Sequence, residues 1–265
     1  MKHKKIVLLL LGLGVILAIL GFVLSKTSID NKTNHMDEFD IVNSKYFERN
    51  YERYKGFKKS HKEYTDDQII TLVNLSMDKN NYTDPETVNE DDGILMFVSK
   101  HYKIREDYVP NLIEVGPLKA LLEENAAKSF NEMAEAAKID ANLFPLKAYM
   151  TYDEIDSLYQ ISQEENGEKY TENYYAKSGY SEYQTGLSVD ISGNTDTFKY
   201  SKEYAWLEEH AYEYGFILRY PEKKEYITGF DYKPWQYRYV GKEAAKEIHD
   251  KNITFDEYYV NNIMK

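Results

Sequence analysis

The sequence predicts an α+β fold in one domain. Segments with helical periodicity come early in the chain, and short apolar runs typical of strands cluster closer to its end. The length of 265 residues suits one domain of ordinary size together with a tether. Hydrophobic residues make up 42% of the chain and aromatic residues 15%, which is the composition of a globular protein rather than a disordered one.

Five segments predict helices and four predict strands or extended chain. Thr65 and Thr151 are typical N-caps, and Gly215 is a typical helix end. The strongest helical pattern begins at Pro117, which suits a first turn, and places Phe130 on its apolar face. The predicted helices span 65–78, 117–140, 150–166, 202–215 and 242–252. The predicted strands or extended segments span 93–102, 107–115, 216–220 and 237–241.

The N-terminal segment predicts a membrane anchor. Residues 6–24 form a run of 19 apolar residues without a charge. As a helix such a run spans about 28 Å, close to the thickness of a bilayer core. It is longer than the apolar region of most cleaved signal peptides, and the chain has no cysteine for lipid attachment. We expect an uncleaved signal anchor, with residues 1–5 in the cytoplasm and the bulk of the chain outside. A cleaved signal peptide is the alternative.

The exported part predicts an acidic domain on a tether. Residues 25–42 are polar and lack periodicity, so they indicate a linker, and residues 43–265 are expected to fold. Three of the 33 basic residues lie in the cytoplasmic tail, which leaves 30 against 45 acidic residues and a net charge of −15 outside the membrane. Such a charge argues against nucleic acid as a partner and against retention on anionic polymers.

Three motifs in the second half of the chain point to a known family. SEYQTGLSVDI (181–191) joins a polar cluster to a strand-like run through a glycine, and WLEEHAYEYGFILRYP (206–221) and TGFDYKPWQYRYVG (228–241) follow it. In order and spacing these motifs resemble the VanY-type D-alanyl-D-alanine carboxypeptidases, zinc peptidases of bacterial cell walls in family M15. Weaker similarity extends the resemblance over residues 45–262. It implies one VanY-like domain in which helices pack on an antiparallel sheet.

The catalytic residues of the family do not carry over to this chain. The resemblance implies zinc held by His, Asp and His, with a Glu that deprotonates the metal-bound water. Tyr183 and Gln236 stand at the two histidine positions, and Asp190 is the ligand that remains. Lys233 stands at the position of the Glu, and an Arg that holds the substrate carboxylate falls at Met150.

These replacements predict a site without metal. A catalytic zinc needs three protein ligands, and Asp190 alone supplies one carboxylate. Lys233 puts a cation where a proton acceptor is required. We therefore expect no zinc cofactor and no functional catalytic residue, and we expect the ammonium of Lys233 to neutralise Asp190 in place of the metal. Tyr183 and Gln236 would hydrogen-bond to each other or to Asp190. In the alternative, Lys233 points into solvent.

Aromatic residues mark a candidate groove. Fourteen of the 26 tyrosines fall between residues 170 and 239. Most are expected to be half-buried strand residues, but the motifs place a few where they could contact a glycan or a peptide. The candidate binding residues are Tyr183, Gln184, Ser188, Asp190, Trp235 and Tyr237.

The sequence thus predicts a membrane-anchored pseudoenzyme outside a bacterial cell membrane. It would keep the groove of the VanY family but neither the metal nor hydrolysis. Its expected partner is the stem peptide of peptidoglycan or a protein of the cell envelope. Two alternatives stay open, a weak or altered peptidase acting on peptidoglycan and a structural or regulatory envelope subunit with a vestigial groove.

Overall fold

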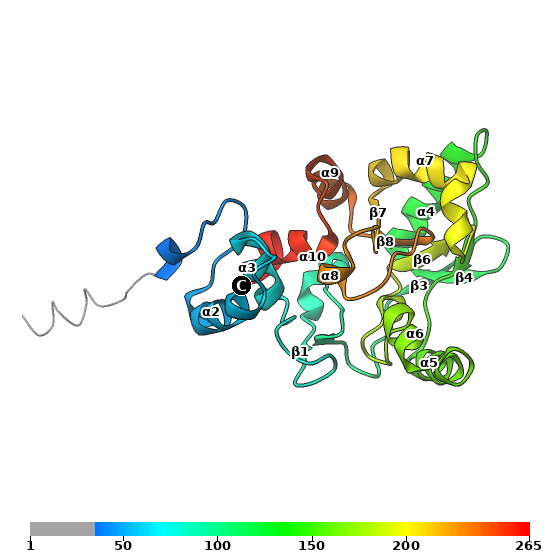
Figure 1. The fold of residues 1–265 in the computed structure, drawn as a ribbon. Helices are drawn as coiled ribbons and strands as arrows, with labels where there is room; N and C mark the ends of the chain where they lie inside the picture. Colours follow the sequence, from blue (N-terminus) through cyan, green and yellow to red (C-terminus); the bar gives the residue numbers. More distant parts are fainter. Residues whose placement is uncertain (1–34) are drawn as a thin grey trace, which may run out of the picture.

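The computed structural model of the protein describes residues 35–265 (Figure 1). The predicted membrane anchor and the first part of the predicted linker lie outside these residues. Among the helices that are described, none is both long enough and apolar enough to cross a membrane.

Short helices and strands alternate along the described chain (Figure 1). The α-helices are α2 (Tyr51–Ser60), α3 (Asp66–Asn74), α4 (Glu124–Ala137), α5 (Tyr152–Asn166), α6 (Glu168–Tyr174), α7 (Lys202–His210), α8 (Glu225–Thr228), α9 (Lys242–Lys251) and α10 (Phe255–Tyr258). The strands are β1 (Glu86–Thr87), β2 (Tyr102–Lys103), β3 (Leu112–Val115), β4 (Ala120–Glu123), β5 (Pro145–Lys147), β6 (Ser188–Ile191), β7 (Phe216–Leu218) and β8 (Gln236–Tyr239).

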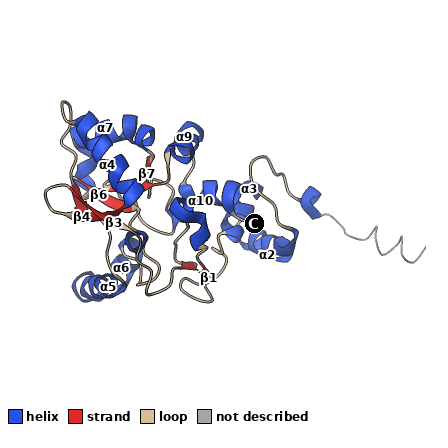
Figure 2. Ribbon diagram, turned by 180° about the vertical axis from the view of Figure 1, so that it is seen from behind, coloured by secondary structure: helices blue, strands red, loops and turns tan. Residues whose placement is uncertain are grey.

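The largest sheet of the described residues, called the central sheet below, has four strands and lies on the side of the molecule away from α2 and α3 (Figure 2). Its strand order is β5-β6-β8-β7, and each pair of neighbours is antiparallel. Two smaller two-stranded sheets, β1-β2 and β3-β4, lie outside it. This mixture of helices and an antiparallel sheet is the α+β class that the sequence predicts.

The two faces of the central sheet differ in chemistry because side chains alternate along each strand. Val189 of β6 pairs with Tyr237 of β8 on one face, and both are buried in the main core. On the same face Phe216 of β7 meets Phe130 of α4 edge-on, with ring centroids 6.3 Å apart. The residues in between point to the opposite face, which therefore carries the polar side chains of β6 and β8.

Capping residues define the helices that the sequence predicts best. Thr65 accepts a hydrogen bond from the backbone N–H of Gln68 and donates its own N–H to the Gln68 side chain, and Thr151 does the same with Glu154. These reciprocal bonds satisfy backbone donors that a helix start leaves free. The predicted starts of α3 and α5 are confirmed.

The prediction of one helix over residues 117–140 is wrong for the first third of that segment. Residues 120–123 form strand β4, which pairs with β3 as a hairpin, and helix α4 begins only at Glu124. The side chain of Glu123 caps α4 by accepting the N–H groups of Asn125 and Ala126. The hairpin buries Leu122 completely, so tertiary pairing overrides the local helical pattern.

The segment predicted as a buried strand over 93–102 also differs. Most of its first half belongs to a 3-10 helix, Glu90–Leu95, and before β2 its strand pairing is limited to an isolated bridge at Ser99. Gly93 interrupts the 3-10 helix with a positive φ of 58°. The apolar run is buried as expected, with Phe97 and Val98 each 1% exposed. Burial without pairing explains the error, because an apolar run alone does not distinguish a strand from other buried chain.

The described end of the predicted linker is not a free tether. Phe39 is buried in a small core with Tyr54 of α2 and Ile69, Ile70 and Val73 of α3. The backbone N–H of Asp40 donates to the Asp66 carboxylate over 2.8 Å. Residues 35–42 therefore pack on the domain, and apolar contacts that a polar composition hides hold them there.

The C-terminus lies beside the N-terminal helices α2 and α3 (Figure 1). The ammonium of Lys45 donates to the carbonyl of Met264 over 2.5 Å, and Arg49 donates to the carbonyl of Lys265 over 2.6 Å. The C-terminal residues thus help to hold the N-terminal helices on the fold.

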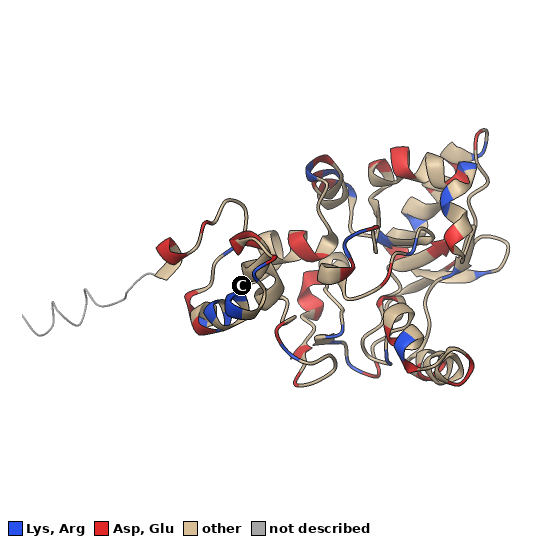
Figure 3. Cartoon of the chain, viewed as in Figure 1, with Lys and Arg blue, Asp and Glu red and all other residues tan. Residues whose placement is uncertain are grey.

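The acidic surplus of the sequence is spread over the described surface (Figure 3). Acidic residues begin several helices, including Asp66 and Asp67 in α3 and Asp153 and Glu154 in α5. Carboxylates in a first turn interact favourably with the helix dipole. Part of the negative charge therefore has a local structural role.

A single glycine sets the position of the polar cluster before β6. Gly186 has a positive φ of 70°, and a Cβ on it would lie 2.9 Å from Cγ of Pro110 and 3.2 Å from the backbone nitrogen of Glu123. We expect Gly186→Ala to lower the free energy of unfolding by about 1–3 kcal/mol, because strain and a clash add. Urea denaturation measures this change.

Gly56, in the middle of α2, is the matched control for this substitution. A Cβ there meets nothing within 4 Å. Alanine in an exposed helix interior is favoured over glycine by about 1 kcal/mol, so Gly56→Ala should be neutral or stabilising. Equal effects of the two substitutions would contradict the role assigned to Gly186.

Candidate functional site

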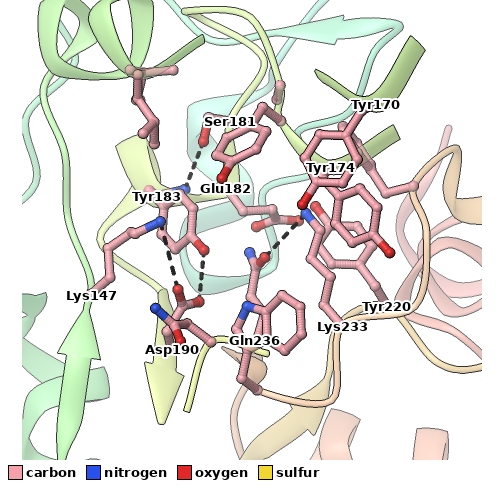
Figure 4. Close-up of a pocket in the computed structure, with 17 residues that line it drawn as sticks. Lys147, Tyr170, Tyr174, Ser181, Glu182, Tyr183, Asp190, Tyr220, Lys233 and Gln236 are labelled. Carbon is pink, nitrogen blue, oxygen red and sulfur yellow. Dashed lines mark hydrogen bonds and ion pairs between the residues drawn. The ribbon is translucent and has the colours of Figure 1, made fainter. Parts of the chain in front are cut away.

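Strand pairing brings Lys147, Asp190 and Gln236 into one row across the polar face of the central sheet. Lys147 of β5 pairs with Asp190 of β6, and Asp190 pairs with Gln236 of β8. Directly paired residues project to the same side, with Cβ atoms about 5 Å apart. In Figure 4 Lys147 and Gln236 lie on either side of Asp190. The row forms the base of the candidate site.

Asp190 is buried and has two partners. Its carboxylate oxygen Oδ1 accepts a hydrogen bond from the Tyr183 hydroxyl over 2.7 Å, and Oδ2 lies 3.8 Å from Nζ of Lys147. Burial raises the pKa of Asp190 to about 6, while Lys147, the Tyr183 hydroxyl and, through space, Lys233 act in the opposite direction. Asp190 is therefore ionised at neutral pH and already neutralised by its neighbours.

Tyr183 is a hydrogen-bond donor held in its neutral form. It lies in the 3-10 helix η4 (Glu182–Thr185), and Nζ of Lys147 stands 5.1 Å from the centre of its ring. Burial and the Asp190 carboxylate raise the pKa of Tyr183 well above its ordinary value. The predicted hydrogen bond between Tyr183 and Asp190 is present, and the phenol keeps its proton.

Lys233 is a buried cation that lies mainly against aromatic rings. Its Nζ is 4.4 Å from the ring centre of Tyr220 and 4.8 Å from that of Phe230. It donates one long hydrogen bond of 3.4 Å to Oε1 of Gln236. Burial lowers the pKa of Lys233 to about 7, although the negative charge of Asp190 partly offsets this. A substantial fraction of Lys233 is therefore an uncharged amine just above neutral pH.

The expected partnership of Lys233 with Asp190 is corrected by the structure. Among the described residues the cation in an ion pair with Asp190 is Lys147, and Lys233 acts on it only through space. The register of β5 puts Lys147 beside Asp190, whereas the N–H of Lys233 is held by the Tyr220 carbonyl. Gln236 in turn accepts from Lys233 instead of bonding to Asp190. The expectation that Lys233 carries a fixed charge also changes, because its pKa is lowered.

A buried ionic network lies behind the row. Glu182 accepts from Nε of Arg219 over 2.6 Å and forms a short ion pair with Arg238, and Arg219 also pairs with Asp256 over 2.6 Å. All four side chains are at most 1% exposed. Burial opposes the charge of Glu182, but Arg238 and Arg219 hold its pKa below the ordinary value. Two cations thus balance two anions, which gives the network a structural role.

A pocket of about 130 Å³ opens over Asp190 and Lys233 (Figure 4). Tyrosines of α6 and of the segment that follows line one part of it. Of the predicted site residues Tyr183, Asp190, Lys233, Trp235 and Gln236 line this pocket. The residues that sequence reasoning missed include Lys147, Tyr170, Tyr174, Tyr175, Asn194, Tyr220 and Phe230.

Three predicted groove residues lie elsewhere. Tyr237 points to the apolar face of the sheet, because it alternates with Gln236 along β8, and it lines a different pocket. Gln184 is buried and donates its side-chain N–H groups to the carbonyls of Arg105 and Glu106. Ser188 shares the face of Asp190 but is fully buried against Glu182. These three residues are structural, and only the tertiary fold distinguishes them from the lining.

Met150, the position of the family's substrate-binding Arg, is also outside the pocket lining. Its backbone N–H donates to the carbonyl of Tyr183 over 3.4 Å. Ile155, one turn into α5, lines the pocket with an apolar side chain instead. This side of the site therefore lacks a cation from α5.

The donor set of the site does not fit zinc. At the positions of the family's metal ligands the oxygen donors are one carboxylate, one neutral phenol and one amide, whereas zinc sites are built from imidazole, thiolate and carboxylate. Asp190 and Gln236 already accept hydrogen bonds or an ion pair from Tyr183, Lys147 and Lys233. Among residues 35–265 no group of three or more His, Asp and Glu side chains could hold a metal ion.

The lowered pKa of Lys233 predicts a pH-dependent contribution to stability. The folded chain releases this proton near pH 7, and an unfolded lysine releases it near 10.5. Between these values the unfolded chain binds more protons, so stability rises with pH by up to about 1.4 kcal/mol per unit. We expect the wild type to gain stability relative to Lys233→Met from pH 7 to pH 9, measured by urea denaturation.

The variant Lys138→Met is the control for this pH series. Lys138 is exposed at the C-cap of α4, and its ion-pair partner among the described residues is Glu135. The groups that face Lys233, namely Asp190, Lys147, Lys100 and Arg219, are the same in all three proteins. Parallel pH curves for the wild type and Lys233→Met would contradict the assignment of a lowered pKa.

Comparison with known proteins gives consistent matches over this site. The family model VanY, described as D-alanyl-D-alanine carboxypeptidase, matches residues 119–242. The D-alanyl-D-alanine carboxypeptidase of Enterococcus faecium is 32% identical over 238 residues, covering 83% of this chain and 73% of the relative. The segment matched by the family model contains the whole row of Lys147, Asp190 and Gln236.

Solved structures show the same similarity. The LdcB LD-carboxypeptidase, whose structure is described as revealing the molecular basis of peptidoglycan recognition, aligns with a TM-score of 0.62 and 34% identity. The alignment covers 67% of this chain and 90% of LdcB. VanYB in complex with D-alanine-D-alanine aligns with a TM-score of 0.56 and 30% identity over 64% of this chain and 98% of VanYB.

Proposed function

Since the chain belongs to the VanY family of D-alanyl-D-alanine carboxypeptidases, we propose that it binds the stem peptide of peptidoglycan without hydrolysing it. The observation that carries this proposal is the state of Asp190. The one acidic position of the family's metal site that this chain retains is neutralised by Lys147 and hydrogen-bonded to Tyr183. The pocket above it remains open.

The residues at Tyr183, Lys233 and Gln236 also replace the groups that hydrolysis in this family requires. Hydrolysis by this family requires a group that activates water and a metal that stabilises the developing negative charge. Here the candidate base position is Lys233 and the metal-binding positions are Tyr183 and Gln236. A neutral phenol and an amide cannot supply the Lewis acid or the nucleophile. Zinc is accordingly proposed to be absent from the working protein.

Two observations support peptidoglycan as the ligand, the similarity to LdcB and VanYB and the tyrosines that line the pocket. The LdcB structure is described in terms of peptidoglycan recognition and the VanYB structure contains D-alanine-D-alanine. The pocket of this chain lies over β6 and β8, within the segment that the family model matches, and is lined by several tyrosines, which suit contacts with a peptide. A predicted anchor at residues 6–24 would hold this pocket at the outer face of the membrane, close to the wall.

One observation favours a second candidate, a weak or altered peptidase. Because the pKa of Lys233 is lowered to about 7, part of it is an uncharged amine that can accept a proton at neutral pH. Such an amine could act as a general base on its own. A protein partner in the envelope, or a regulatory role with an unused pocket, would leave both peptide binding and hydrolysis undetectable.

Retention on purified sacculi tests the proposed function. The full chain in a mild detergent should co-sediment with sacculi and release no D-alanine from a stem pentapeptide. Turnover that depends on Lys233 would establish the peptidase instead. Absence of both retention and turnover would overturn the proposal and favour an envelope protein as partner.

The tyrosines at the mouth of the pocket provide a variant for the same assay. Tyr170 and Tyr174 stack with ring centroids 4.7 Å apart, and both line the pocket. We expect the double change Tyr170→Ala and Tyr174→Ala to weaken retention on sacculi about tenfold through lost stacking. Tyr200→Ala is the control, because Tyr200 is 80% exposed and is not in the lining. Equal retention of all three proteins would exclude this mouth as the binding surface.

A further inference from the structure

Lys233 has fewer partners than a buried ammonium requires. An ammonium offers three N–H donors. Among the described residues, the hydrogen bonds of Nζ amount to one, the 3.4 Å bond to Gln236. The remaining neighbours are the ring faces of Tyr220 and Phe230. Lys233 is only 6% exposed, yet it lines the pocket. Its free donors therefore face a space that a ligand can enter.

The pocket also has one positive charge in excess. The charged residues in its lining are Lys147, Lys233, Asp190 and Glu182. Glu182 belongs to the buried network, in which the two arginines balance Glu182 and Asp256. Asp190 balances one of the two lysines. When Lys233 is protonated, its ammonium has no counter-charge among the lining residues, and this unfavourable burial of a cation is what lowers its pKa.

The size of the pocket limits what can supply the missing charge. Its volume is about 130 Å³, whereas pockets for drug-sized ligands start at about 300 Å³. A continuous peptide chain passing through is too large, but the last residue of a chain is not. Lys147 is 35% exposed and Lys233 is buried, so the two ammonium groups stand at different depths.

We propose that this pocket binds a single carboxylate at the end of a peptide chain, and that the ammonium of Lys233, assisted by Lys147, is the group that recognises it. The inference rests on the proposed function, since the stem peptide supplies such an end. The carboxylate gives Lys233 its missing counter-charge. It also accepts the free N–H donors in a charge-assisted pair, which is stronger than a neutral hydrogen bond.

This assignment differs from recognition by an arginine just before the start of α5. The position of that arginine is Met150, outside the lining, and the apolar Ile155 faces the pocket. Lys233 enters instead from the loop between α8 and β8. In Figure 4 it reaches the centre of the pocket from the side opposite Lys147. The recognising cation thus comes from the loop before β8 and not from the segment that leads into α5.

Calorimetric titration of the full chain with paired peptides tests the proposal. The probes are N-acetylated L-Lys-D-Ala-D-Ala and the same peptide with a C-terminal amide. The wild type should bind the acid about tenfold or more tightly than the amide, the ratio expected from loss of a charge-assisted bond. Free D-alanine and acetate serve as competitors that separate a peptide end from a small carboxylate.

Matched variants locate the recognising cation. Lys233→Met should abolish the preference for the acid over the amide, and Lys147→Met should reduce this preference partly. Lys100→Met is the control. Lys100 also lies over the Phe230 ring, at 4.5 Å, but it donates to the Glu172 carbonyl and is not in the lining. It should keep the full preference for the acid.

The outcomes separate this inference from the proposed function. Equal binding of acid and amide by the wild type overturns the carboxylate site while peptide binding stands, and this result needs no variant. A preference for the acid that survives in Lys233→Met overturns the role of Lys233. If acetate displaces the peptide as effectively as the peptide itself binds, the site recognises any small carboxylate, and the end of a peptide chain is not its specific ligand. Binding of neither peptide, without retention on sacculi, overturns both proposals together.

Discussion

Replacing Glu182 by alanine should lower the free energy of unfolding by about 3–5 kcal/mol, the loss expected when one partner of a buried ion pair is removed. Glu182 is buried between Arg219 and Arg238, and both arginines are themselves at most 1% exposed. The substitution would leave the guanidinium of Arg238 without its carboxylate, and Arg219 with Asp256 alone. Urea denaturation of the full chain, followed by tryptophan fluorescence, measures the loss.

An exposed carboxylate provides the control for this effect. Glu135 pairs with Lys138 over 2.9 Å on the surface of α4. Exposed ion pairs contribute little, so Glu135→Ala should change stability by about 0.5 kcal/mol or less. A change of that size for Glu182→Ala would contradict the view that the network supports the site from behind.

The triple change Tyr183→His, Lys233→Glu and Gln236→His should give the chain the capacity to bind about one zinc per molecule. The strands already hold two of the positions side by side, because Asp190 pairs directly with Gln236. The third is within reach, since the Tyr183 hydroxyl is 2.7 Å from the Asp190 carboxylate. Two imidazoles and a carboxylate are a ligand set that zinc accepts. Elemental analysis after dialysis measures the stoichiometry.

Partial variants identify the source of the gain. With Lys233 retained, the double change Tyr183→His and Gln236→His should bind zinc more weakly, because the ammonium repels the metal ion. Adding Asp190→Ala to the triple variant should abolish binding. Zinc bound equally well by the wild type would overturn the proposed loss of the metal. Recovery of hydrolysis is not expected, since Met150 remains where the family has an arginine.

Which side chains meet in the site depends on strand register, and a single sequence does not show this register. The motif places Tyr183, Asp190, Lys233 and Gln236 together, and all four line the pocket. Lys147 was missed because PLKAYM has no feature that separates it from a surface segment. It reaches Asp190 only because β5 pairs with β6. The cation of the ion pair was therefore assigned to Lys233 instead.

The alternation of side chains along a strand explains the groove residues that were misplaced. Gln236 and Tyr237 are adjacent in the sequence, yet they line pockets on opposite faces of the sheet. Period-two alternation is known in advance, but the residue that faces the site depends on which face α4 covers. Ser188 has the correct face and is nevertheless buried beside Arg238, its partner in the register.

The sequence by itself determined features that depend on a few neighbouring residues. Capping residues such as Thr65 and Thr151, helical periodicity and the identity of the residues at the family's catalytic positions all act over a few residues, so they can be read from the chain directly. What only the tertiary structure decided is which distant groups meet. The pairing of Lys147 with Asp190, the rings that hold Lys233 and the hairpin that replaced the start of a predicted helix depend on contacts between distant segments. Burial and register select these contacts, and local propensity is too weak to oppose them.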